Sequence, residues 1–190
     1  MIQAPNRPAP KEQHFTYSGL NWEQFKALQS AFADSPGVRV SYFQGEVELL
    51  AVSPEHGIAA GNLGYLIEDY MLNTSIDFIG LEDYSIESKG VASAQGDKPY
   101  CFDELKSAPD LVIEVVITGE GETKLKRYAA LNVAEIWFWI DGQISVQRLK
   151  NGKYERLEKS EWLPELNLDL LAKCASIQSR TKAVQAFRKG

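Results

Sequence analysis

One acidic side chain lies inside the most apolar segment of the sequence. The run from Leu111 to Ile117 is apolar except for Glu114, and a Gly-Glu-Gly turn separates this run from Lys124. Burying a carboxylate is costly unless a metal or a cation pairs with it. A second acid, Asp97, stands shortly before the run in a polar segment. Two carboxylates suit Mg²⁺, which prefers oxygen ligands, and a nearby lysine could orient or deprotonate a water or neutralise a phosphate. This combination suits metal-assisted phosphodiester hydrolysis.

The spacing of these residues is also compatible with structural roles. Asp97 follows Gly96 in a predicted loop, where an aspartate is more often a turn residue. His56 lies in the first turn of a predicted helix, and a single histidine there is more often a surface or packing residue. Glu46 and Glu48 alternate with apolar residues of a predicted hairpin, so a solvated face is their simplest interpretation.

The central apolar run predicts a buried strand covered on both faces, followed by a short helix and a second apolar strand. Asp141-Gly142 and Asn151-Gly152 are type I′ turn signals, and Ser53-Pro54 is a helix start. The expected order is a helix at 21–34, a hairpin at 38–51, a long helix at 53–73, short strands at 76–79 and 83–87, a polar loop at 89–98, strands at 100–102, 111–117, 134–140, 144–149 and 154–157, and helices at 169–177 and 182–187. This order predicts an α/β or α+β fold with a mixed sheet and helices on both faces.

Length and composition favour an ordinary globular protein. The chain has 190 residues, 44% hydrophobic residues and a net charge of −6. The negative charge argues against a surface that always binds nucleic acid but allows a local groove. Cys101 and Cys174 show neither metal-site spacing nor a disulfide framework, which favours a reducing, cytoplasmic compartment. No apolar run predicts a transmembrane helix, and the first residues lack the apolar region of a signal peptide. We expect a flexible arm at 1–17 and one domain at 18–190.

Several segments resemble the Uma-two family of restriction-endonuclease-like proteins, which belongs to the PD-(D/E)XK nuclease superfamily. The resemblance covers roughly residues 20–170, and its most specific parts are Pro-Asp-Leu-Val-Ile-Glu-Val and Val-Ala-Glu-Ile-Trp-Phe-Trp. The segments that carry it are LLAVSPEHGIAAGNLGYLI, GDKPYCF, PDLVIEVVIT and TKLKRYAALNVAEIWFWIDGQISVQRL.

The resemblance implies a role for each candidate residue. Asp97 and Glu114 match the two metal-binding acids, and His56 matches the histidine at the start of the long helix. The superfamily's usual lysine position, two after the second acid, is Val116 here, while Lys124 matches the lysine that this family carries on the following helix. The sequence departs from the family pattern at three positions, where Gly96 replaces a frequent proline, Gly57 a frequent acid and Thr123 a frequent aspartate.

The resemblance also implies a restriction-endonuclease-like mixed sheet flanked by helices and a Mg²⁺- or Mn²⁺-dependent endonuclease that acts on DNA, with a homodimer as the expected assembly. Its catalytic residues would be Asp97, Glu114, Lys124 and His56, with Asp97 and Glu114 on the metal. Two alternatives stay open, namely a catalytically inactive binding or interaction module of the same fold and an enzyme for another phosphate-containing substrate.

These roles require a particular geometry. We expect the carboxylates of Asp97 and Glu114, the ammonium group of Lys124 and the first turn of the long helix to border one cleft. We also expect the glycines of that helix to let another segment approach it closely. Removing either carboxylate is expected to abolish cleavage and to leave the fold intact.

Overall fold

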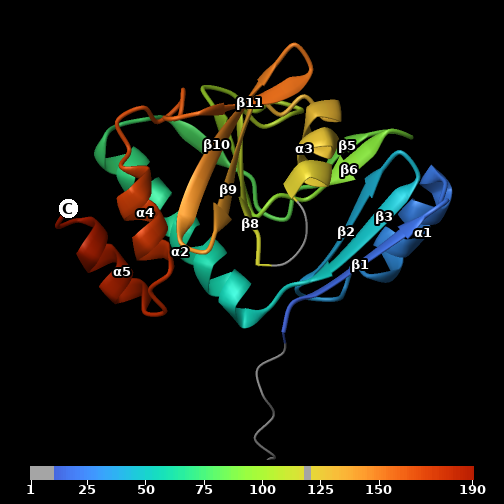
Figure 1. The fold of residues 1–190 in the computed structure, drawn as a ribbon, viewed down its shortest axis with the longest axis horizontal. Coiled ribbons are helices and arrows are strands. Elements are labelled where there is room, and N and C mark those ends of the chain that lie inside the picture. The colour runs from blue at the N-terminus through green and yellow to red at the C-terminus, as the bar shows by residue number, and fades with distance from the viewer. Residues whose placement is uncertain (1–10, 118–120) are drawn as a thin grey trace, which may run out of the picture.

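A computed structural model describes residues 11–117 and 121–190, which contain five helices and two β-sheets (Figure 1). In the view of Figure 1 the first sheet and one helix lie on the right, and the second sheet lies between the other helices. No helix in these two ranges is long and apolar enough to cross a membrane.

The first sheet is antiparallel throughout, with strand order β1-β3-β2-β6-β5. Its outer face packs on α1 through Phe25, Val40, Tyr42 and Val47. Asn21 begins this helix with a capping box shared with Gln24, which satisfies the first backbone N–H groups. The elements are β1 (Gln13–Ser18), α1 (Trp22–Ala31), β2 (Val38–Phe43), β3 (Glu46–Ala51), β5 (Ile86–Ser88) and β6 (Ala92–Ala94).

The inner face of the first sheet is polar, because side chains alternate along each strand. Since Val40 and Val47 face α1, their neighbours Arg39 and Glu48 face the other way. In the register of the sheet, Leu50 of β3 lies opposite both Arg39 of β2 and His14 of β1, so these positions share the inner face.

The second sheet is mixed, with strand order β11-β10-β9-β8-β7-β4, and only β8 and β9 run parallel. Helix α3 connects these two parallel strands. Asp141 and Gly142, like Asn151 and Gly152, all have positive φ, which confirms the two predicted I′ hairpins. The elements are β4 (Phe78–Gly80), β7 (Lys98–Phe102), β8 (Leu111–Val115), α3 (Gly121–Ala130), β9 (Glu135–Ile140), β10 (Gln143–Lys150) and β11 (Lys153–Leu157).

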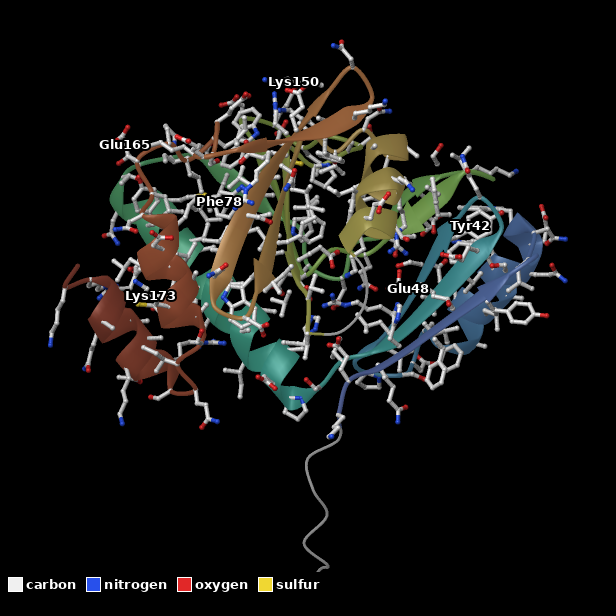
Figure 2. All side chains as sticks on the ribbon, in the orientation of Figure 1. Tyr42, Glu48, Phe78, Lys150, Glu165 and Lys173 are labelled. Atoms are coloured by element: carbon white, nitrogen blue, oxygen red, sulfur yellow. The ribbon has the colours of Figure 1, made fainter. Side chains whose placement is uncertain are left out.

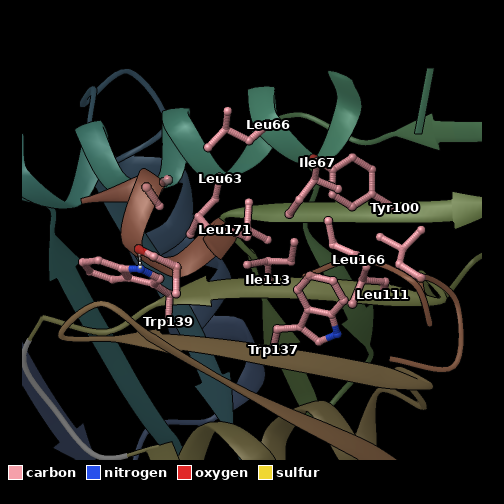
Figure 3. Packing of buried hydrophobic residues seen from close by; sticks show 14 of the residues in the cluster. Leu63, Leu66, Ile67, Tyr100, Leu111, Ile113, Trp137, Trp139, Leu166 and Leu171 are labelled. Atoms are coloured by element: carbon pink, nitrogen blue, oxygen red, sulfur yellow. Dashed lines mark hydrogen bonds between the residues drawn. The ribbon is translucent and has the colours of Figure 1, made fainter. Parts of the chain in front are cut away.

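Helices cover both faces of the second sheet, as the sequence predicts. α2 (Pro54–Asn73), α4 (Leu168–Ala175) and α5 (Arg180–Phe187) lie on one face, and α3 lies on the other. On the first face the core contains Leu63, Ile113, Trp137 and Trp139, and the indole of Trp139 donates to the carbonyl of Ala172 at 3.1 Å (Figure 3). Ser53 caps α2 and Pro54 occupies its first turn, so this predicted start is confirmed.

Two segments differ from the sequence-based expectation. Residues 13–17 of the predicted arm belong to β1, which pairs with β3, whereas residues 1–10 lie outside the described part. The arm prediction was wrong there because this edge strand is exposed over most of its length, including Phe15 and Tyr17, and so gives no pattern of buried residues. The predicted polar loop at 89–98 contains β6, whose three small residues are all buried. So short a strand gives no periodic signal.

The glycines of α2 accommodate side chains rather than another backbone. A Cβ on Gly61 would lie 2.6 Å from Nη2 of Arg180, and one on Gly64 would lie 2.5 Å from Cε of Lys98. Nothing lies within 4 Å of the corresponding position at Gly57. Another segment therefore approaches α2 closely at Gly61 and Gly64 but not at Gly57, and it does so through the side chains of Arg180 and Lys98.

Two glycine-to-alanine changes should have opposite effects on stability. At Gly96 the new Cβ would lie 2.5 Å from Cγ1 of Val112, a core residue of β8, so Gly96→Ala should lower the free energy of unfolding by about 1–3 kcal/mol. Gly64→Ala meets only the flexible end of Lys98, and the helix propensity of alanine should make it neutral or stabilising by up to about 1 kcal/mol. Urea unfolding of both variants measures this difference, and equal losses would contradict it.

Candidate active site

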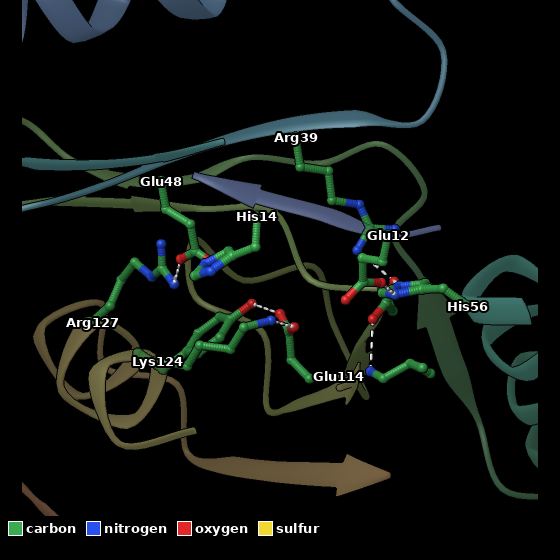
Figure 4. Close-up of polar contacts among 11 residues, drawn as sticks. Glu12, His14, Arg39, Glu48, His56, Glu114, Lys124 and Arg127 are labelled. Atoms are coloured by element: carbon green, nitrogen blue, oxygen red, sulfur yellow. Dashed lines mark hydrogen bonds and ion pairs between the residues drawn. The ribbon is translucent and has the colours of Figure 1, made fainter. Parts of the chain in front are cut away.

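Ten polar and charged side chains gather between the two sheets, where β8 ends (Figure 4). They come from the N-terminal segment, β1, β2, β3, the first turn of α2, the segment between β6 and β7, β8 and α3. We call them the polar cluster, and they are Glu12, His14, Arg39, Glu48, His56, Asp97, Glu114, Lys124, Arg127 and Tyr128.

Glu114 lies on the α3 side of β8. Its strand neighbours Ile113 and Val115 pack with α2 on the opposite face, so alternation turns the carboxylate toward α3. Lys124 and Tyr128 stand four residues apart on that helix, which places both on one face. The ammonium group of Lys124 donates to Oε2 of Glu114, and the hydroxyl of Tyr128 donates to Oε1. As expected, the ammonium group of Lys124 points toward the carboxylate of Glu114.

Tyr128 is a neutral donor in this arrangement. Burial, the charge of Glu114 and the hydrogen bond to it all raise the pKa of Tyr128 well above its usual 10.0. Both oxygens of Glu114 therefore have a protein donor, one cationic and one neutral.

Asp97 lies in the segment that connects the two sheets, and its side chain has no exposed surface. Its Oδ2 accepts the backbone N–H of Val115 at 2.7 Å, so it is fixed beside the residue that follows Glu114. Its Oδ1 accepts from Nε2 of His56 at 2.7 Å and forms an ion pair with Arg39. Burial by itself would raise the pKa of Asp97, but the charge of Arg39, the hydrogen bond and charge of His56 and the Val115 N–H hold that pKa well below its usual 3.8.

His56 bridges two carboxylates. Its Nδ1 lies 2.7 Å from Oε2 of Glu12 and its Nε2 lies 2.7 Å from Oδ1 of Asp97. An ionised carboxylate only accepts hydrogen bonds, so both ring nitrogens must carry a proton. Burial lowers the pKa of His56, but the hydrogen bond and charge of Asp97 and the hydrogen bond of Glu12 outweigh burial and raise it above 6.5. The first turn of α2 therefore borders the site, as expected.

Glu48 belongs to the same cluster, so the prediction that it lies on a solvated face was wrong. Its carboxylate pairs with Arg127 of α3 and accepts from Nε2 of His14 at 2.8 Å. Figure 2 shows Glu48 between the first sheet and the rest of the molecule. Burial would raise the pKa of Glu48, but the charges of Arg127 and Lys124 outweigh it and lower that pKa below its usual 4.5.

A small cavity lies on one side of the cluster, where Glu12, His14, His56 and Asp97 are not among its lining residues. It has a volume of about 10 Å³, and Arg39, Glu48, Glu114, Lys124 and Arg127 are among its lining residues. A space of this size holds no more than one water molecule or one ion. Arg39 and Gln95 also line a larger, open groove of about 810 Å³ between α1 and the first sheet. These two residues therefore separate the groove from the cavity.

Asp97 and Glu114 are the two carboxylates that could hold a divalent cation. Mg²⁺ is usually held by one or two carboxylates together with substrate phosphates, and Asp97 and Glu114 offer two carboxylates near the end of β8. Within residues 11–117 and 121–190, no three acidic, histidine or cysteine side chains are arranged as a ready-made metal cage. Each of the two carboxylates also has a protein cation beside it, Arg39 or Lys124, which a metal would have to displace.

Sequence reasoning located four members of the cluster and missed six. His56 contacts Asp97, Lys124 contacts Glu114, and Asp97 accepts the backbone N–H of Val115, the residue after Glu114. That all four border one cleft stays a prediction, because the small cavity is lined by Glu114 and Lys124 and not by Asp97 or His56. Two other lysines, Lys126 and Lys98, pair instead with Glu122 and Glu82. The missed residues are Glu12, His14, Arg39, Glu48, Arg127 and Tyr128. Two of them, Arg39 and Glu48, could have been found from the sequence, because they are charged residues on the same face of the predicted hairpin.

The folded protein should be most stable in mildly acidic solution. The pKa of His56 is raised, so its contribution to stability is complete below about pH 6.5 and is lost as the pH rises through the folded-state value. The pKa values of Asp97 and Glu48 are lowered, so their contributions are complete above about pH 4 and are lost as the pH falls further. The melting temperature should therefore decline on both sides of roughly pH 4.5–6.5.

Circular dichroism melts across this range measure the profile. His56→Gln should flatten the alkaline decline and leave the acidic one. A melting temperature that rises from pH 6 to pH 8 in the wild type would contradict the assignment.

The sequence was compared with curated proteins and with models of protein families. No curated protein matches the sequence. The model of the Uma2 family, which carries the description "putative restriction endonuclease", matches residues 22–177. This match includes His56, Asp97, Glu114 and Lys124 and covers most of the described fold. The chain therefore belongs to the Uma2 family.

Proposed function

We propose that the protein is a metal-dependent endonuclease that hydrolyses phosphodiester bonds in DNA. The observation that supports this proposal is the position of Asp97 on the backbone N–H of Val115, the residue that follows Glu114, together with the contact between Glu114 and Lys124. Family membership supports a nuclease, and two carboxylates beside a lysine suit this chemistry.

In this proposal Asp97 and Glu114 hold Mg²⁺ or Mn²⁺, and His56 positions Asp97. A bound divalent cation supplies a Lewis acid that offsets the negative charge developing on the phosphate. Lys124 lies beside Glu114 and can orient the attacking water or neutralise charge on the phosphate. Tyr128 keeps Glu114 in place through its other oxygen. The burial of these groups strengthens each interaction, because little water screens them.

Assembly and location stay predictions. Cutting both strands of a duplex requires two active sites, for which a homodimer is the simplest arrangement. The cytoplasmic location rests on the cysteine content of the sequence alone.

A second candidate is a catalytically inactive module of the same fold that binds a partner. It is favoured by the ion pairs of the cluster, because Asp97, Glu114 and Glu48 each already have a protein cation. Such pairing could serve stability in place of turnover. A wild-type protein that binds Mn²⁺ and cuts no form of DNA would support this second candidate.

The nuclease proposal is tested by incubating supercoiled plasmid, linear duplex and single-stranded DNA with Mg²⁺, Mn²⁺, Ca²⁺ or a chelator. We expect cleavage with Mg²⁺ and Mn²⁺ and none with Ca²⁺, which is a poorer Lewis acid. Cleavage that survives the chelator would overturn the metal requirement.

Replacing the lysine should slow this reaction strongly. Lys124→Met keeps the length of the side chain and removes its charge, so the cleavage rate should fall on the order of 10²-fold or more. Lys126→Met is the matched control, because Lys126 lies on the same helix, is exposed and pairs only with Glu122 among the described contacts. DNA affinity should change little in either variant, since one cation is a small share of the phosphate contacts. Equal rates for the two variants would remove Lys124 from the mechanism.

A further inference from the structure

Two cationic side chains lie across one face of α2, on its glycines. Nη2 of Arg180 lies 2.6 Å from the position that a Cβ on Gly61 would take, and Cε of Lys98 lies 2.5 Å from the corresponding position on Gly64. Residues three apart are neighbours on the surface of a helix, so the two cations lie beside each other. One comes from α5 and the other from the first residue of β7. The proposed nuclease chemistry uses neither of them.

Neither cation is held by a buried acid in the part of the chain that the structure describes. Nε of Arg180 lies 3.5 Å from Oδ1 of Asn62, and its guanidinium lies 5.8 Å from the ring centroid of Tyr65. Nζ of Lys98 lies 3.3 Å from Oε1 of Glu82, whose side chain is 82% exposed. Exposed ion pairs of this kind contribute little to stability. A phosphate oxygen could therefore replace these partners at small cost.

The helix that supplies Arg180 is basic, although the chain as a whole is acidic. Residues 178–190 contain four cationic residues and no aspartate or glutamate, in a chain of net charge −6. All four are exposed, and they are Arg180, Lys182, Arg188 and Lys189. The family match ends at residue 177, so α5 lies outside the part of the chain that the family model describes. A local cluster of cations on one helix is typical of a surface that binds a polyanion.

The two cations also lie near the proposed metal site. Lys98 directly follows Asp97 in the chain, and Gly61 comes five residues after His56, which contacts Asp97. At 1.5 Å per residue, Gly61 lies about 7–8 Å beyond His56 along the axis of α2. This length is close to the rise of about two base pairs of DNA, at roughly 3.4 Å each. Figure 1 shows α5 on the same face of the second sheet as α2.

We infer that Lys98 and Arg180 bind the phosphate backbone of the DNA strand that leads away from the proposed metal site. Gly61 and Gly64 give the two side chains room to lie on α2, and the rest of α5 adds positive charge beside them. Such contacts hold and orient the duplex and read no base sequence. This inference rests on the proposed function and adds how the protein holds the DNA that flanks the cleaved bond.

An anionic membrane is the other polyanion that a basic helix could bind. A helix that lies in a membrane interface inserts its apolar face into the lipid. The apolar side chains of α5 are already used, because Val184, Ala186 and Phe187 pack against the protein core and Ala183 is buried. The exposed part of α5 is therefore cationic and polar, which suits the phosphates of DNA better than a lipid surface.

The experiment measures DNA binding and needs no turnover. The Kd for a labelled short duplex is measured by fluorescence anisotropy in the presence of Ca²⁺, at several concentrations of KCl. In the double variant Lys98→Gln with Arg180→Gln, the Kd should rise about tenfold. The slope of log affinity against log salt should become shallower by about 2, because each lost phosphate contact removes about 0.9 from it.

The matched control removes the same two charges elsewhere. Lys153→Gln with Arg156→Gln replaces an exposed lysine and an exposed arginine of β11, which lies at the top of Figure 1, whereas α2 begins near the bottom. Its Kd and salt slope should stay near the wild-type values.

The glycines allow a test that leaves the net charge unchanged. In Gly61→Ala with Gly64→Ala, the new methyl groups would meet Arg180 and Lys98, so both side chains must leave their places on α2. The helix propensity of alanine should keep this variant folded. Its Kd should rise about threefold or more. Gly57→Ala is the control, because nothing lies within 4 Å of the position of its Cβ, and it should bind as the wild type does.

The outcomes separate this inference from the nuclease proposal. Equal Kd values for the charge variant and its control would overturn the inference even if the protein cuts DNA. Weakened binding by the charge variant of a protein that cuts nothing would support the inference and overturn the nuclease. A wild type that binds vesicles of anionic lipid and no duplex would overturn the inference in favour of a membrane partner. If the charge variant does not fold, the two glycine variants still decide.

Discussion

Asp97→Asn should reduce metal-dependent DNA cleavage by about 10³-fold or more. The metal supplies several kcal/mol of stabilisation to the transition state, and each 1.4 kcal/mol corresponds to about tenfold in rate. Asparagine has the size of aspartate, and its amide oxygen can still accept the N–H of Val115. The change therefore removes the charge that would hold the metal and keeps the local geometry.

This variant should also be less stable, which differs from the expectation formed from the sequence. Loss of a carboxylate is expected from sequence alone to leave the fold intact. The side chain of Asp97 is fully buried and pairs with both Arg39 and His56. Removing one partner of a buried ion pair typically costs about 3–5 kcal/mol, because the other charge stays buried without compensation. His56 can lose its proton, and Arg39 can turn to the groove, so we expect the lower part of this range.

The cleavage assay therefore needs a folded variant. Rates are compared at a temperature where circular dichroism shows that both proteins are folded, and Mn²⁺ calorimetry measures the lost metal affinity directly. Asp169→Asn, an exposed aspartate in the first turn of α4, is the matched control. Cleavage at the wild-type rate by folded Asp97→Asn would show that the activity comes from another site.

The parts of the fold that the sequence predicted correctly are those with local signals. The Asp-Gly and Asn-Gly turns fix two hairpins through positive φ, and the Ser-Pro start fixes α2. Glu114 and Lys124 were expected to meet because they are only ten positions apart and Lys124 lies in the first turns of the helix that follows the strand. In each case neighbouring residues contain the necessary information.

The parts that the sequence missed depend on contacts between distant segments. The pair of Glu48 and Arg127 joins residues that are 79 positions apart, and Glu12 and His56 are 44 positions apart. Glu48 alternates with apolar residues in the same way as a solvated glutamate does. Only the packing of the first sheet against α3 buries it, and no property of the hairpin by itself indicates that neighbour.

The pair of Arg127 and Glu48 should contribute the largest single change in stability outside the proposed metal ligands. Arg127→Met should lower the free energy of unfolding by about 3–5 kcal/mol, because Glu48 would stay buried without its ion-pair partner. A similar loss is expected for Glu48→Leu, which leaves the guanidinium of Arg127 buried. Urea unfolding measures both values.

The double variant separates a buried ion pair from simple packing. Glu48→Leu combined with Arg127→Met should recover most of the loss, because well-packed apolar side chains often replace a buried ion pair at little or no cost. Lys126→Met on the same helix is the control. It removes an exposed pair with Glu122, so it should change the free energy of unfolding by only about 0.3–0.5 kcal/mol. Losses that simply add in the double variant would show that the two charges do not depend on each other, and that the polar cluster is more hydrated than its contacts imply.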